Sequence, residues 1–115
     1  MKDDFFWQGN TLTIGSYKRQ FTHLIRDAIP FDNKIVVLLE IPFNDNTINN
    51  IYAVNRKCDI LWQSEDISRV YKNQLLLPYE QMVVENGEIR ASDFYGRRYY
   101  INGDNGKIIK RDIIK

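Results

Sequence analysis

The residue types that carry out catalysis or bind metals are few in this chain. His23 is the only histidine and Cys58 the only cysteine among 115 residues, so sites built from several such ligands are excluded. Cys58 and His23 could form a nucleophile–base pair, and the flanking Arg56 and Lys57 would lower the thiol pKa. Cys58 lies in a predicted polar turn, however, which favours a structural role. We expect no catalytic residue, no metal ion and no cofactor.

Carboxylates are numerous, with 15 Asp and Glu residues, and the sequence does not exclude an acid–base pair of the glycosidase type. Their spacing singles out no particular pair. Glycine-rich phosphate loops are absent, and the segment 104–106 (Asp-Asn-Gly) predicts a turn rather than a calcium loop. A small enzyme or ligand-binding β protein, with a cavity between two β-units of the chain, is one hypothesis that this leaves open.

Residues 95–100 mix cations with aromatic residues, as some nucleic-acid-binding sheets do. Arg97, Arg98 and Tyr99, together with the basic residues of 107–115, would carry such binding. In a strand, however, neighbouring side chains face opposite sides, and the whole chain has a net charge of only +1. A small nucleic-acid-binding β module is therefore an alternative, and we expect nucleic acid to be an unlikely partner.

The segment from Asp59 to Asp93 has the opposite polarity. It holds seven acidic and three basic residues, a local charge of −4. An acidic surface attracts a basic partner, and Tyr and Arg are frequent anchors of protein interfaces. On these grounds the candidate partner-binding residues are Glu65, Asp66, Tyr71, Tyr95 and Arg97.

The composition predicts a mainly β fold. The chain holds 15 Ile and 7 Tyr against three Ala, a balance that suits half-buried strands and disfavours helices. The longest unbroken apolar run, 35–39, is too short to cross a bilayer. One cysteine forms no internal disulfide, and the start of the sequence lacks the pattern of a signal peptide. We therefore expect a cytoplasmic protein with no membrane association.

Two stretches of the chain resemble each other. Residues 28–39 align with 82–93, each reading strand, two-residue turn, strand, with Asp32-Asn33 in one turn and Asn86-Gly87 in the other. Residues 52–62 align with 99–109, and Cys58 then stands near Gly106. We predict a single domain over 1–115 with an internal β-repeat, about 28–63 and 81–110. Two four-stranded antiparallel meanders would pack as a sandwich or a barrel-like fold.

The remaining segments predict a hairpin and one or two short helices. Residues 5–8 and 11–14 read as two strands around Gly9-Asn10. Apolar residues at helical spacing predict a helix over 17–28, with Ser16 as its N-cap. A weaker stripe over 64–77, which includes Gln74, predicts a second helix that ends before Pro78.

The strand and turn pattern resembles that of small bacterial single-domain β proteins of the toxin-immunity type. The residues that carry the likeness are 31–39, 50–54, 60–63 and 93–99, followed by 105–109. The resemblance implies a non-catalytic cytoplasmic protein that binds a bacterial toxin domain and occludes its active site. It carries over no catalytic residue, because the pattern contains none. This is the leading functional hypothesis.

Overall fold

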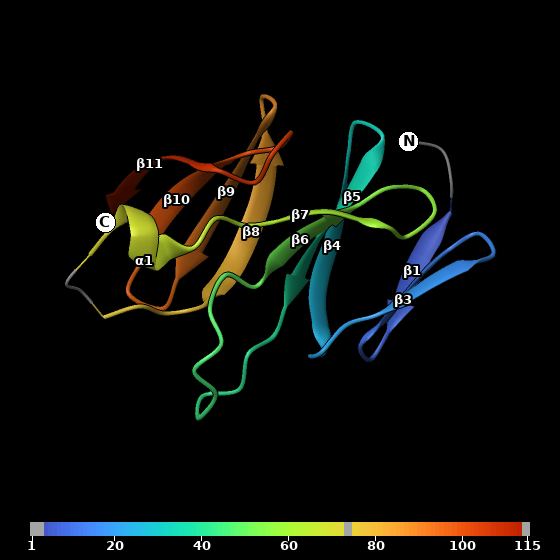
Figure 1. Cartoon of the computed structure of the whole chain (residues 1–115), viewed down its shortest axis with the longest axis horizontal. Helices are drawn as coiled ribbons and strands as arrows, with labels where there is room; N and C mark the ends of the chain where they lie inside the picture. Colours follow the sequence, from blue (N-terminus) through green and yellow to red (C-terminus); the bar gives the residue numbers. More distant parts are fainter. Residues whose placement is uncertain (1–3, 73–74, 114–115) are drawn as a thin grey trace.

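Three antiparallel sheets follow one another along the long axis of the molecule (Figure 1), which measures 43 × 32 × 24 Å. The computed structural model describes residues 4–72 and 75–113. Every sheet joins strands that are consecutive in the sequence. The predicted mainly β fold, with two four-stranded meanders, is confirmed.

The first sheet is formed by β1 (Phe5–Gln8), β2 (Thr11–Ile14) and β3 (Tyr17–Gln20). The predicted N-terminal hairpin is confirmed, but the predicted helix over 17–28 is wrong. Gly15, at φ 59°, lies in a two-residue turn that pairs β3 with β2. Backbone pairing to this neighbouring strand overrides the helical spacing, as tertiary context often does with weak propensities.

The two four-stranded sheets account for most of the remaining chain. The second sheet is formed by β4 (Ile25–Phe31), β5 (Lys34–Leu39), β6 (Ile51–Val54) and β7 (Ile60–Gln63). The third sheet is formed by β8 (Tyr79–Glu85), β9 (Glu88–Asp93), β10 (Arg97–Asn102) and β11 (Ile108–Ile113). Their first hairpins turn at Asp32-Asn33 and Asn86-Gly87, as the turn residues predict.

The second sheet is the middle layer and is covered on both faces. Val36 and Leu38 pack with the third sheet, whereas Val37 and Leu39 pack with the first sheet. Both faces of β5 are therefore apolar, which explains the continuous run of apolar residues 35–39. An antiparallel strand with one face in solvent would instead alternate apolar and polar residues. The first sheet is thus a third layer in addition to the predicted pair.

The two four-stranded sheets share their irregularities. β4 bulges at Arg26, between Ile25 and Asp27, and β8 bulges at Glu80, the position 54 residues further along. Cys58 and Gly106 occupy matching turns, and both have a positive φ, 63° and 77°. The origin of the two sheets from one repeated unit stays a prediction.

Residues 4–72 and 75–113 contain one helical turn, α1 (Ile67–Val70). The Asp66 carboxylate accepts a hydrogen bond from the Ser68 amide and caps it, and Ile67 is fully buried. Tyr71 is already extended, at φ −123° and ψ 98°. Of the helix predicted over 64–77 only this turn forms among the described residues, and Gln74 lies outside them.

Candidate functional site

The candidate site is the end of the molecule where three connecting segments gather below the second and third sheets in Figure 1. We call it the loop end. It comprises the loop 40–50 between β5 and β6, the segment 75–78 before β8, and the turn 93–97 between β9 and β10. Arg97 joins the last two segments, and the first is bonded to β4 and β8, as described below.

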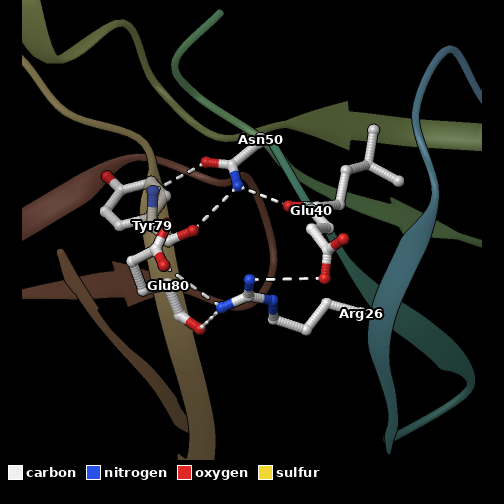
Figure 2. Close-up of polar contacts among 6 residues, drawn as sticks. Arg26, Glu40, Asn50, Tyr79 and Glu80 are labelled. Atoms are coloured by element: carbon white, nitrogen blue, oxygen red, sulfur yellow. Dashed lines mark hydrogen bonds and ion pairs between the residues drawn. The ribbon is translucent and has the colours of Figure 1, made fainter. Parts of the chain in front are cut away.

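The seam between β4 and β8 supports the loop end. Arg26 lies between two carboxylates, as Figure 2 shows, with its guanidinium nitrogens 3.3 Å from Glu40 and 3.2 Å from Glu80. It also donates to the backbone oxygen of Glu80. A bulge re-aims a side chain out of the regular strand pattern, and here the two matching bulges place residues of opposite charge against each other.

Asn50, next to this seam, joins β5 to β8 (Figure 2). Its Nδ2 donates to the backbone oxygens of Leu39 and Tyr79, at 2.7 and 2.9 Å. Its Oδ1 accepts from the Tyr79 amide at 2.8 Å. The side chain is buried, so these three bonds satisfy polar groups that have no contact with water.

An open hollow of about 590 Å³ lies beside the seam. Arg26 and Glu80 line one side of it, and Ser92, Phe94 and Gly96 line the other. The hollow is thus bounded by ion-paired side chains and by an aromatic ring, a combination suited to a side chain or loop of a protein rather than to a fully enclosed small molecule.

The turn 93–97 presents two aromatic rings to solvent. Phe94 is 79% exposed and Tyr95 is 60% exposed. Asp93 is buried and fixes the turn, because its Oδ1 accepts from the amides of Tyr95 and Arg97 and its Oδ2 accepts from Arg97 Nε at 2.7 Å. Arg97 also donates to the Leu75 backbone oxygen at 2.7 Å, which ties the turn to the segment before β8.

Four of the five predicted partner-binding residues form two pairs. Tyr95 and Arg97 lie together at the loop end, with the guanidinium 5.8 Å from the ring centroid. Glu65 and Asp66 lie at the opposite end of β10, where Glu65 accepts from the Ile108 amide. They line a second open hollow of about 490 Å³. Hydrogen bonds from Ser68 hold the Asp66 pKa below its ordinary value.

Tyr71 lies between these pairs and is packed against the core. Its ring meets Tyr99 edge-on at 5.8 Å, and the Arg111 guanidinium covers it at 4.0 Å. Much of this ring is therefore engaged inside the molecule. The partner-binding role of these five residues stays a prediction, and the structure brings Tyr95 and Arg97 to one surface and Glu65 and Asp66 to another.

The carboxylates of the acidic segment bond within the chain. Within the described residues, six of the seven accept hydrogen bonds from the chain itself. The pairs are Asp59 with Asn55, Glu65 with Ile108, Asp66 with Ser68, Glu80 with Arg26, Glu85 with Arg90, and Asp93 with Arg97. These pairs are spread over both ends of two sheets, so the acidic residues do not gather at one end of the fold.

Two of the three aromatic residues of the nucleic-acid hypothesis, Tyr99 and Tyr100, are not free to stack on bases, whereas Tyr95 is exposed. Tyr99 lies in the core, and Tyr100 is only 8% exposed. Lys110 covers the Tyr100 ring at 4.5 Å, and Arg98 forms a two-pronged ion pair with Asp112 at 2.8 and 2.9 Å. Base stacking requires an open ring face, which neither tyrosine offers.

Cys58 and His23 lie in different parts of the fold and have different partners. Cys58 is buried in the turn between β6 and β7, and burial raises the pKa of its thiol, contrary to the lowering expected from flanking cations. His23 Nε2 lies 2.8 Å from Asp45 Oδ2 in the loop 40–50. Hydrogen bonds from Thr47, then from His23, lower the Asp45 pKa to about 2. This loop contact gave no signal in the sequence.

Three further features concern the space between the sheets, metal binding and membrane crossing. Apolar and aromatic side chains fill the space between the second and third sheets, where the hypothesis of a ligand-binding protein places a cavity. Among residues 4–72 and 75–113, no group of three or more His, Cys, Asp or Glu is placed to hold a metal ion. The helix of this part of the chain is far too short to cross a bilayer.

Comparison with known proteins assigns a family. No curated protein matches the sequence at a significant level. The family model described as "Domain of unknown function (DUF7957)" matches residues 3–113, nearly all of the 115 residues. The three-layer fold and the loop end therefore lie within the matched span. The chain belongs to the DUF7957 family.

Proposed function

We propose that this chain is a non-catalytic protein-binding protein whose partner contacts the loop end. The observation that carries the proposal is the turn 93–97, in which a buried carboxylate holds Phe94 and Tyr95 in solvent beside an open hollow. Exposed aromatic rings next to a hollow with a polar rim are typical of protein interaction sites.

The rigidity of this turn favours tight binding. Four hydrogen bonds converge on Asp93, three on its carboxylate and one from the Gly96 amide on its backbone oxygen. Ordering a side chain or loop at an interface opposes association. Because the backbone that carries the rings is already held in place, little of the cost of ordering that backbone remains when the rings are buried against a partner.

The more specific part of the proposal is that the partner is a bacterial toxin domain and that binding occludes its active site. This rests on the resemblance of the strand and turn pattern to small bacterial immunity proteins. Action in the cytoplasm is proposed with it, because the single cysteine forms no internal disulfide of the kind that stabilises small secreted domains.

The test is binding to the toxin domain encoded next to the gene for this chain, measured by titration calorimetry. We expect a dissociation constant in the nanomolar range or below. Phe94→Ala and Tyr95→Ala should each weaken binding by about 30-fold or more, the loss typical of an interface hot spot.

Phe6→Ala is the matched control, because Phe6 is 59% exposed, close to the 60% of Tyr95, but lies in the first sheet. It should bind like the unmodified protein. No detectable complex, or an equal loss for Phe6→Ala, would contradict the proposal.

A further inference from the structure

Phe43 is a fully exposed aromatic residue in the turn 42–45 of the loop 40–50. In Figure 1 this loop, drawn in green, projects beyond the ends of the strands that it joins. A phenyl ring so fully exposed gains nothing from folding. Its place in a projecting loop is therefore suited to burial against another molecule.

The loop that carries Phe43 is held in shape by its own hydrogen bonds. The Asp45 amide donates to the Pro42 backbone oxygen at 2.9 Å, and Asp45 Oδ1 accepts from the Thr47 amide at 2.8 Å. The other carboxylate oxygen of Asp45 contacts His23 Nε2. Asp45 thus connects the loop both to itself and to the turn that precedes β4.

The base of the loop is fixed to the seam. The Glu40 amide donates to the Leu24 backbone oxygen at 2.8 Å, and the Glu40 carboxylate contacts Arg26. Asn50, at the other end of the loop, is the buried residue that bridges to Tyr79. Both ends therefore rest on the strands beside the hollow that Phe94 lines.

We infer that Phe43 is an anchor that inserts into an apolar pocket of the protein partner, with the loop 40–50 as the recognition element. The inference rests on the proposed function and deepens it by naming the inserted group. From Ile41 to Asn50 the loop contains no Lys or Arg, and its one charge is Asp45. The partner should therefore have an apolar pocket that accepts a phenyl ring. The rim of this pocket should be neutral or basic, with hydrogen-bond donors that face the amide oxygens of Asn44 and Asn46.

The first arm of the test needs no partner. Backbone ¹⁵N relaxation should show that residues 42–47 are as rigid as the strands on the ps–ns timescale, with order parameters of about 0.85. Asp45→Ala should lower them in the loop alone. A loop that is already mobile in the unmodified protein would contradict the inference.

The second arm uses the same neighbour-encoded toxin domain in titration calorimetry. Phe43→Ala should weaken binding by about 30-fold or more, and Asp45→Ala should weaken it by a smaller factor. Phe43→Leu, which keeps an apolar side chain, should fall between the unmodified protein and Phe43→Ala. Because Phe43 is fully exposed, its variants should unfold at the same urea concentration as the unmodified protein, so a change in affinity is not a change in folding.

A Phe43→Trp variant reports the insertion directly. Its additional emission should shift to shorter wavelength on complex formation, as an indole does when it leaves water. If Phe43→Ala binds normally while Phe94→Ala does not, the inference is overturned and the proposed function stands. If no variant and no unmodified protein forms a complex, both are overturned.

Discussion

Asn50 joins β5 to β8 next to the seam between β4 and β8. It is buried, and its amide satisfies two backbone oxygens and one backbone amide in strands that are far apart in the sequence. Arg26 and Glu80 add an ion pair at the exposed side of the same seam. The hollow and the loop 40–50 both rest on this small set of contacts.

Asn50→Ala should therefore destabilise the fold by roughly 2–4 kcal/mol, because three hydrogen bonds are lost and buried backbone groups remain unsatisfied. The measurement is the free energy of unfolding in urea. Asn46→Ala, on the exposed part of the same loop, should change it by less than about 0.5 kcal/mol. Equal effects of the two substitutions would show that the fold does not depend on Asn50.

Two glycines with the same backbone conformation separate strain from crowding. Gly87 and Gly106 both have φ 77°, but a Cβ on Gly87 meets no atom within 4 Å, whereas one on Gly106 would lie 2.5 Å from the Trp62 ring. Gly87→Ala should cost about 1 kcal/mol for the positive φ. Gly106→Ala should cost about 1–3 kcal/mol more, from overpacking against Trp62. Urea unfolding of both variants gives the difference, and equal costs would contradict the tight packing at Gly106.

At the scale of elements, the hairpins were predictable and their long-range contacts were not. Asn86-Gly87 determines its turn locally, because both residues adopt a positive φ. No local feature of the sequence indicates the contact of His23 with Asp45, 22 positions apart, or that of Arg26 with Glu80, 54 positions apart. Residue type alone indicates Tyr95 and Arg97 of the turn 93–97 as candidate binding residues. Phe94 and Phe43 were missed, because exposure is a property of the folded chain.

The helix predicted over 17–28 failed for a related reason. Apolar residues spaced at 17, 21 and 25 fit a helix, yet the same residues also fit two short strands around a loop. The β2 strand offers backbone partners to residues 17–20, and Tyr, Phe and Ile have a stronger preference for strands than for helices. Periodicity over so few turns does not separate the two structures.

The loop 40–50 has a pH dependence that can be measured. The Asp45 pKa is lowered from 3.8 to about 2, so its charged form stabilises the folded state above the unfolded-state pKa, and this contribution is lost as the pH falls through about 2. Asp45→Asn should lower the urea midpoint at pH 5. The difference from the unmodified protein should shrink steadily toward pH 2. A difference that is the same at both pH values would contradict the role of the Asp45 charge.

At the scale of the whole molecule, three layers replace the predicted two. The N-terminal residues, expected to form a hairpin and a helix, form a complete sheet that covers the outer face of the second one. The apolar run 35–39 contained this information, since it leaves no polar face on β5. Composition alone did not determine which segment would cover that face.

Substitutions on opposite faces of β5 test the layered arrangement. Val36 and Val37 are both fully buried, one toward the third sheet and one toward the first. Val36→Ala and Val37→Ala should each cost about 1–3 kcal/mol in urea unfolding. Val83→Ala, on a side chain that is 49% exposed, should cost less than about 0.5 kcal/mol. A small cost at Val37 would show that the first sheet does not cover the second.

The central claim is that a protein partner binds the loop end, and hydrogen–deuterium exchange tests it most directly. Exchange is compared for the chain alone and in complex with the neighbour-encoded toxin domain. We expect the partner to slow exchange only in residues 40–48, 75–78 and 93–97. Exchange in the rest of β10 and in β11 should be unchanged. Protection centred on β10 and β11, or on the hollow that contains Glu65 and Asp66, would contradict it.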